Sequence, residues 1–211
     1  MRVIIFDMDG TLLDSRKDIT ISINHIRKEH YGLEPLDEDY VVKCINMDER
    51  NLPELFYGTK TYQQKDRELF EIHYAIQCTQ NTYLYDGVFQ TLKKLKALGV
   101  KLSVATNAPT PFALRMLQHL DVIDMFDMVI GADKVKCSKP DPEMINIILE
   151  NYGFDKSKDK AWLVGDSSKD MLSAKNANID AIFATWGFSP ESEYEKIADF
   201  PDEVVEMICS F

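Results

Sequence analysis

The chain has few features that would place it in a membrane or outside the cell. None of its 211 residues falls in an apolar run near the ~20 residues that a membrane-spanning helix needs. The apolar stretch at residues 3–6 is also too short for the core of a secretory signal. We therefore expect a cytoplasmic protein.

Clustered cysteines are also missing. The four cysteines stand at positions 44, 78, 137 and 209, and none belongs to a CxxC pair or to a Cys/His cluster. Zinc sites need ligands at closer spacing, and disulfide frameworks are typical of shorter chains that are denser in cysteine. We expect reduced thiols, most of them packed in the interior.

Positive charge is in short supply. The sequence has 24 lysine and arginine residues against 35 aspartate and glutamate residues, which gives a formal net charge of −11. A surface this acidic repels the phosphates of nucleic acids and the headgroups of anionic membranes. We expect neither a nucleic acid nor a membrane as a partner.

Short apolar runs alternate with helical patterns along most of the chain. Strands that alternate with helices form a parallel sheet with helices on both faces, and continuous apolar runs are typical of strands buried on both sides. The sequence therefore predicts an α/β fold with a doubly wound parallel sheet. The apolar runs lie at residues 3–6, 100–105, 127–130, 161–164 and 181–184, and the helical patterns at 88–98, 112–120, 142–152, 167–177 and 201–209.

One long stretch breaks this alternation. Residues 15–83 contain no strand-like run, but they carry helical patterns at 15–32, within 36–57 and at 61–77. A helical block of this size between the first strand and the rest of the sheet indicates an inserted domain. We expect an α/β core domain of residues 1–14 and 84–211 and a helical domain of residues 15–83.

Charged and polar side chains follow the predicted strands. The carboxyl ends of parallel strands meet at one edge of the sheet, where ligands bind in open α/β folds. We therefore expect the side chains that follow the strands to form one site. They are Asp7 and Asp9 after the first strand, Thr106 and Asn107 after the second, Lys139 after the third, and Asp166 and Asp170 after the fourth.

The make-up of this site indicates phosphoryl chemistry. Four carboxylates repel one another unless a cation that prefers oxygen ligands, such as Mg²⁺, lies between them. A cation, a lysine and a hydroxyl group together bind a phosphoryl group, and a neighbouring carboxylate can attack it to form an aspartyl-phosphate. The expected partner is a small phosphorylated metabolite.

Four sequence motifs carry a resemblance to a known family. DMDGT at 7–11, VATN at 104–107, KPDP at 139–142 and GDSSKD at 165–170 resemble, in this order, the four motifs of the haloacid dehalogenase (HAD) superfamily. The helical insertion resembles the small cap domain of that superfamily. The resemblance covers essentially the whole chain. Within the superfamily, the chain resembles the subfamily that contains phosphoglycolate phosphatase and β-phosphoglucomutase. It implies a Rossmann-like core with an inserted cap.

The resemblance implies a role for each motif residue. Asp7 matches the nucleophile, and Asp9 matches the general acid/base that protonates the leaving oxygen and then activates water. Thr106, with Asn107 beside it, matches the position that holds the phosphate, and Lys139 matches the lysine that neutralises charge there. Family members that cleave carbon–halogen bonds lack an acid at the second position, so Asp9 favours phosphate esters.

The resemblance also implies a Mg²⁺ ion. Asp7, Asp166 and the backbone carbonyl of Asp9 match its ligands. Asp170 matches the second acid of the fourth motif, which supports the metal or its waters. Mg²⁺ at this place would offset negative charge in the transition state.

The choice of substrate is expected to depend on the helical insertion. In the superfamily the cap covers the site, and its specificity loop matches residues 43–50 of this chain. Lys43 and Arg50 are candidates for contact with the substrate. Many relatives have a glycine-rich turn here, whereas this chain reads CINMD at 44–48, so the identity of the substrate does not transfer. Trp186 and Gly187 follow the fifth strand, and there we expect ordinary packing.

We expect a Mg²⁺-dependent phosphatase that hydrolyses a small phosphomonoester, phosphoglycolate-like or a sugar phosphate, through an aspartyl-phosphate. A β-phosphoglucomutase-like phosphotransferase is the first alternative, and a nucleotide or pyrophosphate phosphatase on the same scaffold is the second. A non-catalytic regulatory module is disfavoured because the set of motif residues is complete. The sequence leaves open whether the protein is a monomer or a homodimer.

Overall fold

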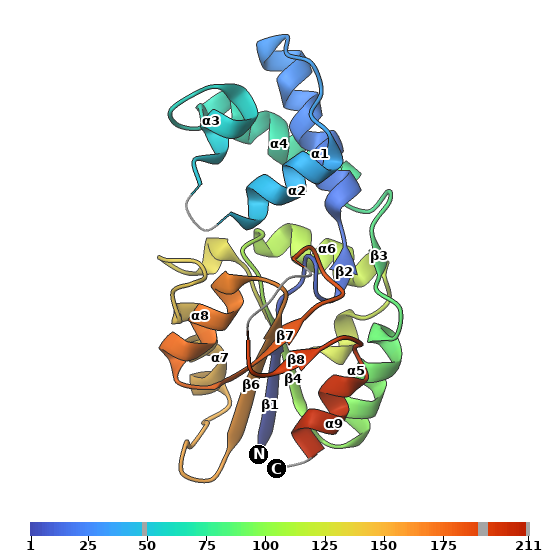
Figure 1. The fold of residues 1–211 in the computed structure, drawn as a ribbon, viewed down its shortest axis with the longest axis vertical. Coiled ribbons are helices and arrows are strands. Elements are labelled where there is room, and N and C mark those ends of the chain that lie inside the picture. The colour runs from blue at the N-terminus through green and yellow to red at the C-terminus, as the bar shows by residue number, and fades with distance from the viewer. Residues whose placement is uncertain (48–49, 190–193, 210–211) are drawn as a thin grey trace. The chain divides into compact units, whose positions relative to one another are not determined.

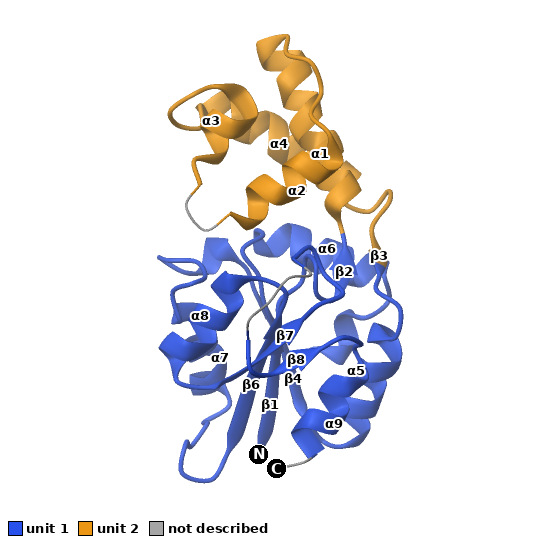
Figure 2. Ribbon diagram, in the orientation of Figure 1, with its two compact units in different colours: residues 1–14, 84–211 blue, residues 15–83 orange. Residues whose placement is uncertain are grey.

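The chain forms two compact units (Figure 2). The structure is a computed structural model that describes residues 1–47, 50–189 and 194–209. Unit 1 contains Met1–Asp14 and Leu84–Phe211, and unit 2 contains Ser15–Tyr83. The chain therefore leaves unit 1 soon after the first strand and returns to it once.

A six-stranded parallel sheet forms the centre of unit 1 (Figure 1). Its strand order is β5–β4–β1–β6–β7–β8, so the first strand of the chain lies in the middle, paired with β4 on one side and β6 on the other. The predicted doubly wound parallel sheet is confirmed. The strands are β1 (Arg2–Phe6), β4 (Lys101–Ala105), β5 (Met128–Ile130), β6 (Lys160–Gly165), β7 (Asp180–Ala184) and β8 (Ile197–Ala198).

Helices cover both faces of this sheet (Figure 1). Val3 and Ile5 of β1 pack in a core cluster with α7 and α8, whereas Phe6 lies on the other face with α5 and α9. Because side chains alternate along a strand and both faces are covered, the strands are apolar throughout. The helices are α5 (Val88–Ala97), α6 (Thr110–His119), α7 (Glu143–Asn151), α8 (Ser168–Ala177) and α9 (Glu203–Cys209), with short turns at Ile123–Met125 and Ala132–Lys134.

Unit 2 is built from helices around its own small core. Asp37 starts one of them, because its side chain accepts hydrogen bonds from the backbone N–H groups of Asp39 and Tyr40. The helices are α1 (Arg16–Ile26), α2 (Glu38–Asn46), α3 (Leu52–Tyr57) and α4 (Gln64–Gln77), with a π-helical turn at Arg27–Tyr31. The buried core residues are Ile23, Ile26, Val41, Cys44, Phe56 and Tyr57.

Some short elements differ from the sequence predictions. The last helix of unit 2 begins at Gln64 instead of residue 61, where the Asp66 side chain accepts a hydrogen bond from the backbone N–H of Gln63. The two-residue strands β2 (Leu13–Asp14) and β3 (Tyr83–Leu84) pair with each other, and β8 extends the main sheet. Two residues are too few to show a periodic pattern, so these strands leave no signal in the sequence.

Two expectations from the sequence concern the burial of the cysteines and the lack of membrane-spanning helices. Cys44 and Cys78 are buried, but Cys137 and Cys209 are exposed, so the expectation that most cysteines are packed holds for two of the four. All four are free thiols. Across the described residues, no helix combines the length and the apolar composition needed to cross a bilayer.

A buried carboxylate joins the first and last helices of unit 2. Asp18 of α1 has no exposed surface. Its oxygens accept hydrogen bonds from the Gln77 side chain, from the backbone and side chain of Asn81, and from the Thr82 hydroxyl, at 2.6–3.1 Å. Burial raises the pKa of Asp18, but these hydrogen bonds outweigh it and hold the pKa below its usual range. The ionised carboxylate therefore stabilises the folded state.

We predict that Asp18→Asn lowers the free energy of unfolding by about 2–3 kcal/mol, because the new amide hydrogens would meet hydrogen-bond donors. The folded-state pKa lies below the unfolded value. The stabilisation is therefore fully present above about pH 4 and is lost as the pH falls through the folded-state pKa. Urea unfolding at a series of pH values measures this. The difference in the free energy of unfolding between wild type and variant should become smaller as the pH is lowered.

The matched control is Glu71→Gln, at an exposed position of α4. It should change the free energy of unfolding by less than about 0.5 kcal/mol. Equal losses in the two variants would contradict the role of Asp18.

Candidate active site

A lysine and two aspartates are in direct contact at the carboxyl edge of the sheet. Lys139 Nζ lies 2.5 Å from Asp7 Oδ1 and 2.6 Å from Asp170 Oδ1. Asp7 directly follows β1, Asp170 lies in the first turn of α8, and Lys139 lies in the loop before α7. All three are buried, so solvent screens the ion pairs little. Asp7 and Lys139, 132 positions apart in the sequence, thus meet through one ammonium group.

Three carboxylates gather around this lysine. Asp7, Asp166 and Asp170 each place a carboxylate oxygen within 4.8 Å of the others, and all three residues are buried. One ammonium group therefore faces three carboxylates, a surplus of two negative charges. A single Mg²⁺ ion carries the charge that would balance them, and oxygen atoms are the ligands it prefers.

Burial and the neighbouring charges shift the pKa values of the site residues. Burial raises the pKa of Asp7 well above its usual range, and Asp170 and Asp166 add to the rise, which Lys139 partly offsets. Burial and the charge of Asp170 raise the pKa of Asp166 to about 7. Burial lowers the pKa of Lys139, but Asp170 and Asp7 outweigh it and raise the pKa above its usual range. A bound cation would stabilise the ionised carboxylates, so these residues fit Mg²⁺.

The side chain of Asn107 holds the main chain of Lys139. Asn107 Nδ2 donates to the Lys139 carbonyl oxygen at 3.0 Å, and the Lys139 backbone N–H donates to Asn107 Oδ1 at 2.9 Å. The sequence predicts Asn107 as a substrate-binding residue. In the structure its side chain is engaged with Lys139 and so positions that lysine.

Thr106 and Asp170 are also fixed by local hydrogen bonds. Thr106 is buried directly after β4, and its hydroxyl oxygen accepts a hydrogen bond from the backbone N–H of Ala108 at 3.0 Å. The Thr106 hydroxyl hydrogen can therefore donate to a substrate oxygen. Asp170 Oδ2 accepts hydrogen bonds from the backbone and the hydroxyl of Ser167 in a capping box that starts α8. Because Asp170 Oδ1 contacts Lys139, this aspartate positions the lysine.

A tight turn follows the nucleophile candidate. The backbone N–H groups of Thr11, Leu12 and Leu13 all point to the Met8 carbonyl oxygen. Gly10 has φ +89, and a Cβ atom there would lie 2.4 Å from Asp166 Oδ2, so the position needs glycine for both its backbone angle and its space. Asp9 is partly buried in this turn, two residues from Asp7. Its side chain is not one of the three clustered carboxylates found among the described residues.

The two candidates for substrate contact lie in unit 2. Lys43 is exposed on α2, and Arg50 is partly buried beyond the end of that helix. Two further residues of the expected specificity loop, 48 and 49, lie outside the described residues. The roles of Lys43 and Arg50 stay predictions.

Sequence reasoning missed a contact between the loop after β7 and the acidic cluster. The backbone N–H of Phe188 donates to Asp166 Oδ2 at 2.8 Å, and Thr11 Oγ1 donates to Asp166 Oδ1 at 3.3 Å. Both Asp166 oxygens are thus oriented by neighbours. The rule that sites lie at strand ends points to residues 185–188 as well, because they follow β7.

The chain is similar in sequence to known hydrolases and phosphatases. The family model "Haloacid dehalogenase-like hydrolase" matches residues 4–184. Phosphoglycolate phosphatase from Aquifex aeolicus is 34% identical over 212 residues, which cover 99% of this chain and 97% of that protein. N-acetylmuramic acid 6-phosphate phosphatase from Pseudomonas aeruginosa is 28% identical, over 99% of this chain and 95% of that protein.

A solved structure shows the same fold. The crystal structure of a predicted phosphatase from Clostridium acetobutylicum matches with a TM-score of 0.84 at 23% identity, over 100% of this chain and 99% of that one. At this identity the likeness speaks for the fold alone, whereas the family model and the Aquifex relative cover the motif residues in sequence. The chain belongs to the haloacid dehalogenase-like hydrolase family.

Proposed function

We propose that the protein is a Mg²⁺-dependent phosphatase that hydrolyses a small phosphomonoester through an aspartyl-phosphate at Asp7. The observation that carries the proposal is the buried contact of Lys139 with Asp7 and Asp170, beside Asp166. This arrangement places a carboxylate, a positive charge and candidate metal ligands around one point, as phosphoryl transfer requires. The relatives named above are phosphatases that act on a phosphorylated acid and a sugar phosphate, which supports this reaction class.

The first step transfers the phosphoryl group to the protein. An oxygen of Asp7 bonds to phosphorus while the bond between phosphorus and the ester oxygen breaks. The carboxyl group of Asp9 gives its proton to that oxygen, so the alcohol leaves neutral. Lys139 and the Thr106 hydroxyl donate hydrogen bonds to the phosphoryl oxygens, where they stabilise negative charge.

The second step returns the protein to its starting state. Asp9, now ionised, takes a proton from a water molecule whose oxygen bonds to phosphorus. The bond between phosphorus and the Asp7 oxygen breaks, which releases inorganic phosphate and leaves Asp9 protonated again. One carboxyl group therefore serves both steps, and no other proton donor is needed.

The remaining site residues hold this geometry. Asp7, Asp166 and the backbone carbonyl of Asp9 would bind Mg²⁺, which supplies Lewis-acid stabilisation of the phosphoryl oxygens. Asp170 and Asn107 position Lys139 through its side chain and its main chain. Unit 2 would act as the cap that selects the leaving group, with Lys43 and Arg50 as contacts for a polar or anionic substrate.

A β-phosphoglucomutase-like phosphotransferase would use the same residues, but the phosphoryl group on Asp7 would pass to a sugar hydroxyl instead of to water. An activity assay with a panel of phosphorylated acids, sugar phosphates, nucleotides and pyrophosphate distinguishes the proposed phosphatase from these alternatives. We expect net release of inorganic phosphate that depends on Mg²⁺ and stops with a chelator. Interconversion of hexose phosphates without net release would contradict hydrolysis.

We predict that Asp7→Asn lowers phosphate release by at least about a thousandfold, because an amide cannot form the covalent intermediate. Initial rates with saturating Mg²⁺ and the best substrate of the panel measure this. The control Glu150→Gln, exposed at the end of α7, should keep the wild-type rate. Turnover by Asp7→Asn within tenfold of wild type would overturn the assignment of the nucleophile.

We predict that the effect of Asp9→Asn depends on the leaving group. With an alkyl phosphate, whose alkoxide needs a proton, kcat should fall by about 10²–10⁴-fold. With 4-nitrophenyl phosphate, whose leaving group is stable as an anion, the loss in the first step should be much smaller, and a burst of nitrophenolate should precede slow hydrolysis. Equal losses on both esters and no burst would contradict the role of Asp9 as general acid.

A further inference from the structure

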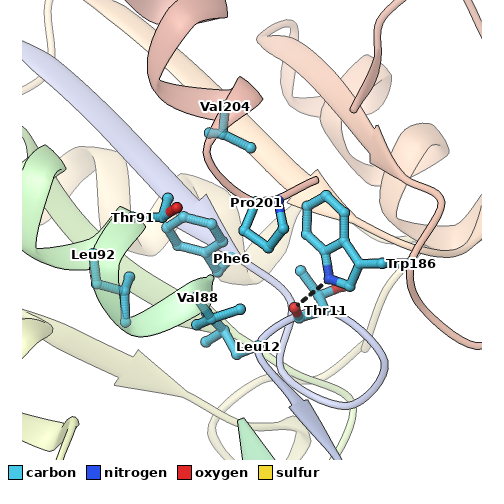
Figure 3. Close-up of a pocket in the computed structure, with 9 residues that line it drawn as sticks. All are labelled: Phe6, Thr11, Leu12, Val88, Thr91, Leu92, Trp186, Pro201 and Val204. Atoms are coloured by element: carbon cyan, nitrogen blue, oxygen red, sulfur yellow. Dashed lines mark hydrogen bonds between the residues drawn. The ribbon is translucent and has the colours of Figure 1, made fainter. Parts of the chain in front are cut away.

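The loop after β7 touches the candidate site at two places. Trp186 Nε1 donates a hydrogen bond to the Thr11 carbonyl oxygen at 2.9 Å (Figure 3). Two residues later, the Phe188 backbone N–H donates to Asp166 Oδ2 at 2.8 Å. The segment 185–188 therefore contacts both the turn that follows Asp7 and the carboxylate that follows β6.

Between these two hydrogen bonds, the backbone at Gly187 lies very close to the backbone at Gly10. A Cβ atom on Gly187 would lie 2.1 Å from the Gly10 carbonyl oxygen and 2.5 Å from Asp166 Cβ. Such distances are shorter than any van der Waals contact, so a side chain at this position would push the loops apart. The absence of a side chain at Gly187 brings the segment against the turn.

The indole ring of Trp186 has apolar side chains on its other side. It borders a small apolar pocket to which Phe6 and Leu12 contribute from the first part of the chain (Figure 3). Pro201 and Val204 line the same pocket from the C-terminal segment and α9. The ring is half-buried, and its N–H points to the Thr11 carbonyl oxygen.

We propose that Trp186 is a positioning residue for the cation site. Its N–H fixes the Thr11 carbonyl and with it the turn of residues 8–13, which carries Asp9 and the Thr11 hydroxyl that orients Asp166. The part that concerns Mg²⁺ rests on the proposed function. The part that concerns the turn rests only on the hydrogen bond and the packing.

The first test measures the turn in the metal-free protein. Its backbone N–H groups at Gly10–Leu13 are all hydrogen-bonded within the turn, so their hydrogen exchange reports its opening. Trp186→Phe keeps an aromatic ring and removes the N–H. We expect exchange in a peptide covering residues 8–13 to be about tenfold faster, because the carbonyl that anchors the turn loses its donor.

Two companion proteins separate the hydrogen bond from the packing. Val204→Ala enlarges the same pocket but keeps the bond to Thr11, so it should leave exchange in residues 8–13 unchanged. Replacement of Trp186 by 3-benzothienylalanine keeps the ring shape and loses only the N–H, so it should match Trp186→Phe. Wild-type exchange in the benzothienylalanine protein, or equally fast exchange in Val204→Ala, would overturn the proposal.

The second test measures Mg²⁺ binding by calorimetry without substrate. Outer contacts of this kind are worth about tenfold or more in metal affinity, so Trp186→Phe should raise the Kd for Mg²⁺ about tenfold while Val204→Ala does not. Unchanged affinity in Trp186→Phe would overturn its link to the cation site. If the wild type binds no Mg²⁺ while the exchange results hold, the proposed function fails and the positioning of the turn by Trp186 stands.

Discussion

The structure of unit 1 depends on keeping three carboxylates together around one lysine. Buried like charges repel strongly, so Asp7, Asp166 and Asp170 can stay close only if rigid elements hold them and positive charge faces them. The central place of β1 in the sheet supplies the rigidity, since its carboxyl end is flanked by the ends of both neighbouring strands. Lys139 offsets one of these three negative charges through its contacts with Asp7 and Asp170. The two charges that remain favour a bound cation.

Hydrogen bonds from several segments orient the charged residues of the site. Asn107 fixes the main chain of Lys139, Ser167 fixes Asp170, and the segment with Trp186 and Phe188 fixes the turn after Asp7 and the carboxylate of Asp166. Asn107 and the segment with Trp186 and Phe188 thus orient residues of other loops, whereas Ser167 and Asp170 belong to the same turn at the start of α8. These hydrogen bonds restrict the orientation of the charged side chains. Electrostatic stabilisation of a transition state requires charged groups that are preorganised in this way.

The regular part of the fold could be predicted from the sequence because it depends on periodicity. Apolar runs indicated five of the six strands of the main sheet, and the position of Asp7, Lys139 and Asp166 after them indicated one shared edge. Side-chain partners could not be predicted, because a motif gives a position but not a hydrogen bond: Asn107 turned toward Lys139, and Trp186 turned toward Thr11. Lys43 and Arg50 belong to unit 2, whereas the acidic cluster belongs to unit 1, and their part in substrate choice stays a prediction.

The strand order has a consequence for synthesis on the ribosome. The helical unit of Ser15–Tyr83 is complete, with its own core, before the lysine and the second pair of acids have been made. The first strand, β1, cannot pair until later, because both of its neighbours in the sheet, β4 and β6, follow it in the chain. Asp7, the proposed nucleophile, is therefore among the first residues translated and among the last to gain its neighbours in the site. A nascent chain cannot acquire the activity until nearly the whole core has emerged, so enzymatic turnover would report completed folding of that core.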